Sequence, residues 1–224
     1  MAQIFVSHSR HDQALIDYLS RIAAGTNVRL IFEELERLVS GEVTGEKIKN
    51  DISQSNAVFV LVSRHVHQLP HTRDWVVWEC GVASNKDIWV LEPLADLGAV
   101  TVVTPVLQNY VLFDPSDSWF AYFRQIIESY DDTHVLGTVL LSTGVGALFG
   151  KEKGAVVGAA AGLALANGVR PRPPGQPIFC GNKTCASSYS IHLAQGQRRF
   201  RCPVCNGALE LQLPPSAIDL PAFI

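Results

Sequence analysis

Gln3-Ile-Phe-Val-Ser7 is a short apolar run that ends in polar residues, and together with the residues after it this stretch decides the fold. Residues 12–24 follow it with apolar side chains at helical spacing, at Leu15, Ile16, Leu19, Ile22 and Ala23. A short apolar run predicts a buried strand, and a repeat of three and four residues predicts an amphipathic helix. The chain is therefore expected to begin with a strand, a polar loop and a helix.

The same alternation continues outward from this segment as far as residue 132. Apolar runs predict strands at residues 28–32, 57–62, 88–92 and 109–113. The segments that follow the second, third and fifth strands include helices expected over residues 45–54, 74–85 and 115–130. Strands that alternate with helices indicate an α/β fold with a parallel sheet covered on both faces. Functional residues of such folds lie in loops after the strands, so we expect them in Ser7 to Arg10 and in Ser63 to Arg73.

Charge is distributed unevenly along the 224 residues. Residues 1–134 carry 10 Lys and Arg against 18 Asp and Glu, whereas residues 135–224 carry 8 against 3. The acidic first half argues against a nucleic-acid-binding groove there, because phosphate contacts need clustered cations. The first residues lack a basic segment followed by a long apolar run, so no signal peptide is expected and the cytoplasm is the expected location.

Between residues 135 and 169 the composition changes to Gly, Ala, Leu and Val. Two apolar stretches flank the segment Lys151 to Gly154, and glycines recur at positions 146, 150, 154, 158 and 162. Glycine at every fourth position lets two helices approach closely in lipid, whereas in water each glycine costs a helix about 1 kcal/mol. We expect a glycine-zipper helical hairpin that inserts into a membrane or packs in an oligomer. A soluble packing role or a flexible spacer is the alternative.

A proline-rich linker over residues 170–178 is expected to be extended, and a cysteine-rich segment over residues 179–213 follows it. Four of the five cysteines lie in this segment, at Cys180, Cys185, Cys202 and Cys205. Two cysteine pairs separated by sixteen residues resemble a zinc ribbon, in which four thiolates hold a structural Zn²⁺ and leave no position open for water. So short a segment buries little core, and metal binding is expected to supply its folding energy.

Three sequence elements occur in the order that TIR domains show. The first is the strand and polar loop from Ile4 to Asp12. The second is a loop with glycines that leads into a helix and then into a buried strand ending in serine, and its residues are Gly41, Gly45, Ile52, Ser55 and Ser63. The third is a tryptophan followed four residues later by a glutamate, Trp75 and Glu79. Residues 1–132 therefore resemble a TIR domain of the NAD-cleaving type, and its combination with a glycine-spaced hairpin and a ribbon looks prokaryotic.

The resemblance implies a flavodoxin-like parallel sheet and an NAD glycohydrolase or cyclase that cleaves the bond between nicotinamide and ribose. It places Glu79 as the catalytic carboxylate and Trp75 as an aromatic wall against the base. Ser7, Ser9 and Arg10 lie where the loop after the first strand faces the nucleotide, and Arg10 is able to pair with phosphate. The leaving group is already cationic, so a carboxylate that stabilises an oxocarbenium-like centre matters more than an acid.

Other interpretations stay open for the same residues. TIR domains also serve as non-catalytic scaffolds, in which Glu79 is a solvated helix residue and Trp75 a core aromatic side chain. A nucleoside deoxyribosyltransferase-like enzyme is the rival at the level of the fold. Ser7, Ser9 and Arg10 are alternatively turn-capping residues, and Cys80 is interpreted as a small buried apolar residue. For the NAD-cleaving enzyme we expect a self-associating defence or signalling effector that assembles through TIR surfaces and the glycine-zipper helices.

Overall fold

The structure, a computed structural model, describes residues 1–34, 41, 44–68, 70–96, 107–131, 173, 175–193 and 197–211. The expected glycine-zipper hairpin at residues 135–169 lies outside these residues. A seven-stranded sheet with the order β2-β1-β3-β4-β5-β7-β6 forms the centre of the described fold. A second sheet has two strands, β8 and β9. The α/β class with a mostly parallel sheet is thereby confirmed.

Five parallel strands come from the first half of the chain. They are β1 (Ala2–His8), β2 (Val28–Glu34), β3 (Ala57–Leu61), β4 (Asp87–Pro93) and β5 (Asn109–Phe113). Every residue of β3 is buried, as is expected for a strand with helices on both sides of the sheet. Because all five strands run in the same direction, their carboxyl ends meet at one edge of the sheet, where polar side chains gather.

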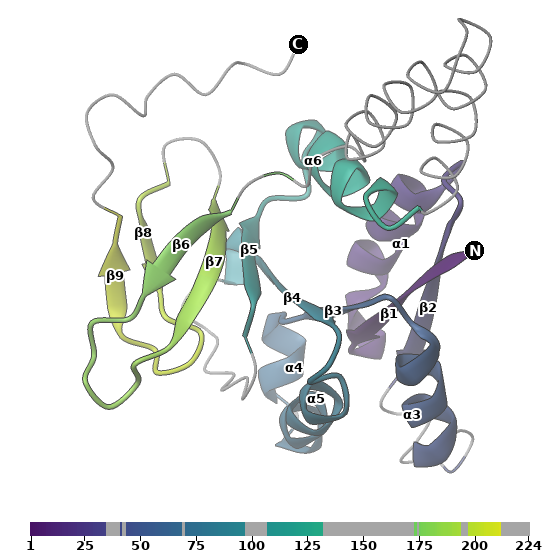
Figure 1. Cartoon of the computed structure of the whole chain (residues 1–224), viewed down its shortest axis with the longest axis horizontal. Helices are drawn as coiled ribbons and strands as arrows, with labels where there is room; N and C mark the ends of the chain where they lie inside the picture. Colours follow the sequence, from purple (N-terminus) through teal and green to yellow (C-terminus); the bar gives the residue numbers. More distant parts are fainter. Residues whose placement is uncertain are drawn as a thin grey trace, which may run out of the picture.

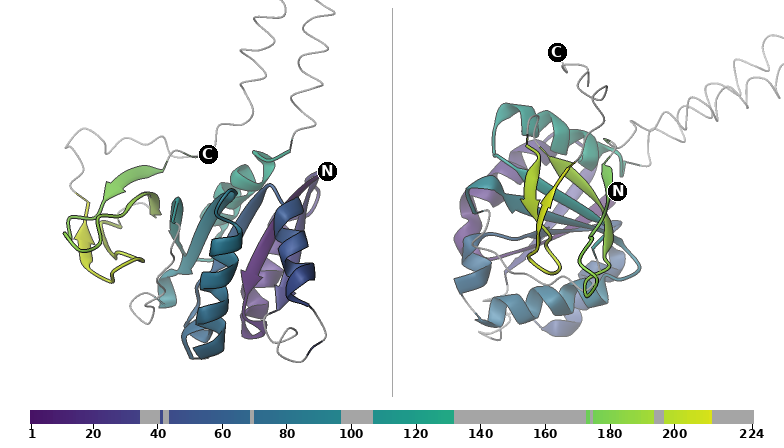
Figure 2. Two further views of the ribbon diagram at one scale, coloured as in Figure 1. Left: turned by 60° about the horizontal axis from the view of Figure 1, so that its bottom comes forward. Right: turned by 90° about the vertical axis from the view of Figure 1, so that its left-hand side faces the viewer.

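Helices cover both faces of this sheet (Figure 1; Figure 2). Helices α1 (Gln13–Ala23) and α6 (Asp117–Glu128) lie on one face, where Leu19 and Phe123 are fully buried in a common core. On the other face lie α3 (Gly45–Gln54), α4 (Arg64–Gln68) and α5 (Pro70–Val82), and their apolar side chains share a second core. The two cores hold the layers of the α/β fold together.

Within the segment from Ser63 to Arg73, residues 64–68 and 70–73 are helical, whereas a loop was expected. Helix α4 begins directly after Ser63, whose hydroxyl accepts a hydrogen bond from the backbone N–H of His65 at 3.2 Å. Helix α5 starts at Pro70, four residues before the expected position. Proline is favoured at the first position of a helix, because its missing N–H has no helical partner there. Because α5 starts earlier than expected, Trp75 and Glu79 both lie in its interior.

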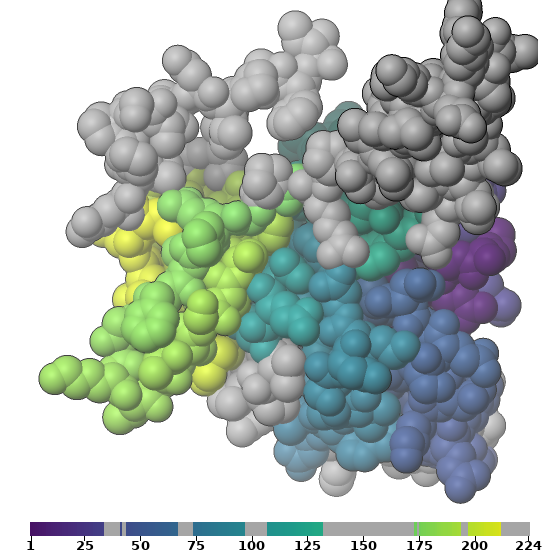
Figure 3. All heavy atoms as spheres, in the orientation of Figure 1, coloured from purple at the N-terminus to yellow at the C-terminus, as the bar shows by residue number. Residues whose placement is uncertain are grey.

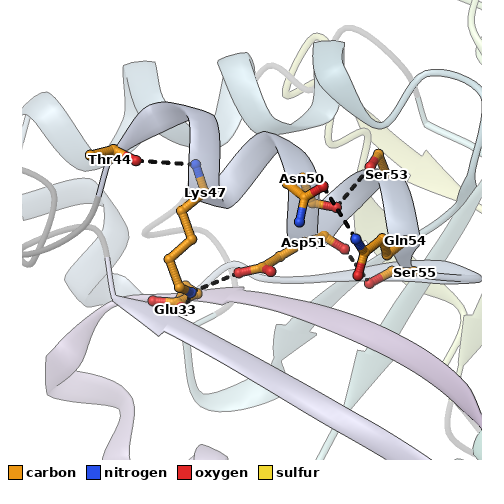
Figure 4. A network of polar contacts seen from close by, with 8 residues as sticks. All are labelled: Glu33, Thr44, Lys47, Asn50, Asp51, Ser53, Gln54 and Ser55. Carbon is orange, nitrogen blue, oxygen red and sulfur yellow. Dashed lines mark hydrogen bonds and ion pairs between the residues drawn. The ribbon is translucent and has the colours of Figure 1, made fainter.

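Polar contacts fix the start of α3 and join it to β2 (Figure 4). Thr44 caps the helix, with its hydroxyl accepting a hydrogen bond from the backbone N–H of Lys47 at 3.2 Å. The Lys47 ammonium contacts the Glu33 carboxylate on β2 and lies 2.8 Å from the Asp51 carboxylate one turn along α3. The side chain of Lys47 is half exposed, so solvent weakens both ion pairs.

Replacing Thr44 by alanine is expected to lower the free energy of unfolding by about 1 kcal/mol, because the capped N–H loses its acceptor. Thr44→Ser keeps the hydroxyl and is expected to stay close to the natural chain. Urea unfolding of both variants measures the difference. Equal destabilisation by alanine and serine would show that the threonine methyl group, and not the cap, is what matters.

The cysteine-rich segment, expected to form a separate terminal module, contributes two strands to the main sheet. Strand β7 (Ser188–Leu193) pairs in parallel with β5, and β6 (Gln176–Phe179) pairs with β7 in antiparallel orientation at the sheet edge. Strands β8 (Arg199–Arg201) and β9 (Ala208–Glu210) form the small second sheet. In the space-filling view this segment lies directly against the teal part of the chain (Figure 3).

The end of the proline-rich linker is extended, as expected, and forms part of β6. Pro177 lies in this strand, where a residue without an N–H is tolerated because β6 has a neighbour on one side only. Among the helices of the described residues, none is long and apolar enough to cross a membrane.

Candidate functional site

Ser7, Trp75 and Glu79 meet at the carboxyl end of β1. Ser7 is the penultimate residue of β1, and its hydroxyl donates a hydrogen bond to Oε2 of Glu79. Trp75 lies one turn before Glu79 on α5, and its indole N–H donates to Oε1 of Glu79 at 2.9 Å. Residues at positions i and i+4 share one face of a helix, which brings this pair together over the sheet. Both carboxylate oxygens therefore have a partner within the protein.

Burial sets the electrostatics of Glu79, whose exposed fraction is 1%. Removal from water disfavours the charged form and raises the pKa of Glu79 to about 7, although the hydrogen bonds from Ser7 and Trp75 oppose the shift. A carboxyl group of this kind changes its charge close to neutral pH. Perturbed titration of a buried carboxyl group is more frequent at functional sites than elsewhere in proteins.

Two stacked indole rings lie beside Glu79. The centroids of Trp75 and Trp78 are 4.4 Å apart with an angle of 26° between the ring planes. Trp78 is 37% exposed, so the stack reaches from the buried carboxylate to the surface. Flat aromatic rings of this kind can stack against a heterocyclic base.

Ser9 and Arg10 lie beyond Ser7, in the turn that follows β1. Ser9 is fully buried and caps a short 3₁₀ turn, Arg10–Asp12, where its hydroxyl accepts a hydrogen bond from the backbone N–H of His11 at 3.4 Å. Asp12 completes the capping box by accepting a hydrogen bond from the backbone N–H of Ser9 at 3.2 Å. Arg10 is exposed at the start of this turn. The structure thus joins Ser7, Trp75 and Glu79, and gives Ser9 a capping role.

A second polar contact between strand ends, not foreseen as a site, involves Asp12 and Ser63. Burial raises the pKa of the Asp12 carboxyl group, and a hydrogen bond with the Ser63 side chain partly offsets this shift. The imidazole rings of His11, in the 3₁₀ turn, and of His65, in α4, lie with centroids 5.6 Å apart. Both segments follow parallel strands, and that common position is the sequence feature from which their proximity could have been predicted.

Glu92 is a second buried glutamate, two strands away from Ser7 in the sheet. The hydroxyl of Tyr110 donates a hydrogen bond to its carboxylate. Burial raises the pKa of Glu92 to about 7, with the Tyr110 hydrogen bond opposing the shift and the charge of Asp96 adding to it. Asp96 is itself paired with the Arg64 guanidinium at 2.7 Å. Glu92 was not predicted as a site residue, although its place at the end of an apolar run could have indicated a buried carboxyl group.

The four cysteines of the C-terminal segment form a compact cluster. All four sulfur atoms lie within 4.8 Å of one another, with 3.7 Å between Cys180 and Cys205 and 3.9 Å between Cys185 and Cys202. A tetrahedral zinc site with Zn–S bonds of about 2.3 Å places its sulfur atoms about 3.8 Å apart. The donor set and its spacing therefore fit a metal ion bound by four thiolates.

The carboxylate site and the cysteine cluster lie on the same side of the main sheet, because neighbours of both belong to one core.

No family model matches this chain, and no curated protein matches it. The chemistry of these two sites is therefore the basis for assigning a function.

Hydrogen-bond donors surround the sulfur atom of Cys202. Burial by itself raises the pKa of this thiol, but the donors outweigh burial and lower the pKa to about 7. They are the backbone N–H groups of Cys205 and Val204 and the Ser187 hydroxyl group, which lies 3.7 Å from the sulfur atom. The Ser187 hydroxyl group was not predicted as part of the site, and it contacts this thiol from outside the ligand set.

Cys80 lies apart from this cluster, on α5 next to Glu79. It is fully buried, and burial together with the charge of Glu79 raises the pKa of its thiol to about 12. A thiol that stays protonated at neutral pH is a poor nucleophile. The interpretation of Cys80 as a small apolar core residue agrees with this environment.

Proposed function

We propose that the chain is a TIR-type NAD glycohydrolase or cyclase in which Glu79 is the catalytic carboxylate. The observation that carries the proposal is the buried Glu79 carboxylate, with a pKa raised to about 7, held between Ser7 and Trp75. The TIR-like order of sequence elements adds support, since it leads to the same glutamate. The substrate is NAD, and the products are nicotinamide and linear or cyclic ADP-ribose.

The proposed reaction breaks the bond between the nicotinamide nitrogen and C1′ of ribose. Nicotinamide leaves with the bonding electron pair, and positive charge develops at C1′ and the ring oxygen. The Glu79 carboxylate stabilises this charge and accepts hydrogen bonds from the ribose hydroxyl groups. Water then adds to C1′ and loses a proton, or the adenine of the same molecule closes the ring.

Substrate binding requires a local rearrangement at Glu79, because its side chain is almost completely buried and each of its oxygens already accepts a hydrogen bond, from Ser7 or from Trp75. A ribose hydroxyl group takes the place of the Ser7 hydroxyl, since both donate the same kind of hydrogen bond. The Trp75–Trp78 stack supplies the flat wall for the nicotinamide or adenine ring. Arg10, which is exposed in the turn that follows β1, keeps its proposed place beside the phosphates, whereas the buried Ser9 caps this turn.

The experiment is incubation of concentrated, clustered protein with NAD, followed by chromatography of nicotinamide and the ADP-ribose products. We expect cleavage by the natural chain and its loss in Glu79→Ala. Glu92→Gln is the matched control, because it removes another buried carboxylate with a similar pKa outside the site and is expected to keep cleavage. Intact NAD with the natural chain, or equal losses in both variants, would reject the proposal.

We also propose that Cys180, Cys185, Cys202 and Cys205 bind one Zn²⁺ ion. Four protein thiolates fill a tetrahedral shell, so the ion would stabilise the fold and leave no position for a substrate. Measurement of the zinc-to-protein ratio tests this site. We expect one equivalent in the natural chain and in Cys80→Ser, and a clear loss in Cys202→Ser.

A non-catalytic TIR scaffold is the second candidate, favoured by the near-complete burial of Glu79 and by the protein partners of both its oxygens. Such a protein would self-associate through its TIR surfaces and the glycine-zipper helices and leave NAD intact. Membrane fractionation tests the contact of residues 135–169 with lipid. The deoxyribosyltransferase alternative predicts exchange of bases on deoxynucleosides in the same chromatographic assay.

A further inference from the structure

We infer, on the basis of the metal binding proposed above, that the ion clamps the β8–β9 hairpin over β5 and β7, so that metal occupancy controls this edge of the α/β sheet. The cysteine site is then a part of the α/β domain, and metal loss uncovers the core beneath the hairpin. Four sets of contacts carry this inference.

The cysteines join two separate hairpins. Cys180 directly follows β6 and Cys185 lies in the turn before β7, whereas Cys202 follows β8 and Cys205 precedes β9. Both of the close sulfur pairs, Cys180 with Cys205 and Cys185 with Cys202, cross from one hairpin to the other. An ion bound by all four sulfur atoms therefore crosslinks the edge of the main sheet to the small sheet.

The first of these hairpins is tied to the α/β body by backbone and side-chain contacts. Strand β7 pairs with β5 over four residues, and the backbone N–H of Ser190 donates to the carbonyl of Gln108 at 2.8 Å. On the face that α6 covers, the hydroxyl of Tyr122 contacts Nδ1 of His192, and the Trp89 ring lies 5.1 Å from the imidazole. The β6–β7 hairpin thus remains part of the sheet whether or not metal is bound.

The second hairpin covers the opposite face of the same strands. Phe200 and Leu211, at its two ends, are buried in the core that contains Tyr110 and Leu112 of β5. Strands β8 and β9 have three residues each, and so short a two-stranded sheet is only marginally stable in water. The ion supplies the attachment that the few apolar contacts of this hairpin cannot supply alone.

A row of buried side chains extends from the cysteines into the sheet. Tyr189 lies in the same buried core as Cys180 and Cys202, and its ring packs edge-on against the Tyr110 ring with centroids 6.3 Å apart. The Tyr110 hydroxyl donates to Glu92 at the carboxyl end of β4. Detachment of the small sheet would therefore loosen side chains as far as the functional edge of the α/β domain.

The test is hydrogen exchange of the full-length, zinc-loaded protein before and after treatment with a chelator and a thiol reductant. Backbone amides of β5 and β7 are expected to exchange about tenfold faster or more after metal removal, while those of β1 change little. Unchanged exchange in β1 would show that the domain stays folded, and restored protection after addition of ZnCl₂ would show that the effect of metal removal is reversible. Cys202→Ser is expected to behave like the chelated protein, and Cys80→Ser like the loaded one.

Two results would overturn the clamp. One is unchanged exchange in β5 and β7 after removal of zinc that was present. The other is an equal gain of exchange in β1, which would mean that the ion acts on the whole domain. The zinc-to-protein ratio is measured on the same sample, so absence of zinc rejects the metal site itself and is distinguishable from both results.

Discussion

Glu79→Gln is expected to abolish NAD cleavage and, at pH 8, to raise the free energy of unfolding by roughly 3 kcal/mol. The folded pKa of Glu79 is about 7, against an ordinary value of 4.5. The folded chain therefore holds this proton more tightly than the unfolded chain, and folding becomes less favourable as the pH rises from 4.5 to 7. Glutamine carries no charge and avoids the cost of burying one, but it cannot stabilise a ribosyl cation.

Urea unfolding at pH 5 and pH 8 measures the stability effect. The difference between Glu79→Gln and the natural chain is expected to grow from roughly 1 kcal/mol at pH 5 to about 3 kcal/mol at pH 8. Glutamine can keep both contacts, because its oxygen accepts from Trp75 and its amide can donate to the Ser7 hydroxyl. The control is exposed Glu46→Gln, for which no comparable gain is expected. Equal stabilities of the two chains at pH 8 would contradict a buried, ionised Glu79.

A buried carboxylate that destabilises the fold at neutral pH bears on the choice between enzyme and scaffold. An interaction module gains nothing from a charge inside α5, and a neutral residue at this position would make the fold more stable. Catalytic residues often lower the stability of the fold, because activity requires an arrangement that is not the most stable one. If Glu79→Gln is more stable and still self-associates, while NAD cleavage is lost, the carboxylate serves chemistry and not assembly.

Much of the α/β domain could be predicted because its elements are defined by local sequence. Strand β5 and helix α3 begin and end at the expected residues, 109–113 and 45–54. Thr44 precedes α3 as a capping residue, and the apolar run of β5 ends in Phe113-Asp114. Local hydrogen bonds and the periodic burial of apolar side chains determine both elements, and the sequence shows both features.

The position of β7 in the main sheet could not be predicted in the same way. Its residues Ser188 to Leu193 alternate between polar and apolar, which is typical of any half-buried strand. The choice of β5 as its partner depends on contacts between distant residues, such as Trp89 and Tyr122 with His192. At the carboxylate site, Trp75 and Glu79 were predicted from a local pattern that resembles TIR domains, a tryptophan followed four residues later by a glutamate, whereas the partnership of Tyr110 and Glu92 joins two strands.

Tyr110→Phe is the variant with the second large expected effect. It keeps the ring in the core but removes the hydroxyl group that donates to Glu92. At pH 8 Glu92 is ionised, and losing a hydrogen bond to a buried charge is expected to lower the free energy of unfolding by about 2–3 kcal/mol. At pH 5, below its raised pKa of about 7, Glu92 is protonated, and the loss is expected to be about 1 kcal/mol.

A double-variant cycle with Glu92→Gln isolates the pair. Tyr110→Phe in the Glu92→Gln background is expected to cost about 1 kcal/mol at both pH values, since no charge is left to stabilise. A pH-independent loss in the single variant would show that the Tyr110 hydroxyl stabilises the protein through other contacts. The Tyr110→Phe variant also bears on the metal clamp, because the Tyr110 ring packs against the Tyr189 ring of β7. Loosening β5 at Tyr110 is expected to speed amide exchange in its neighbour β7 while zinc stays bound.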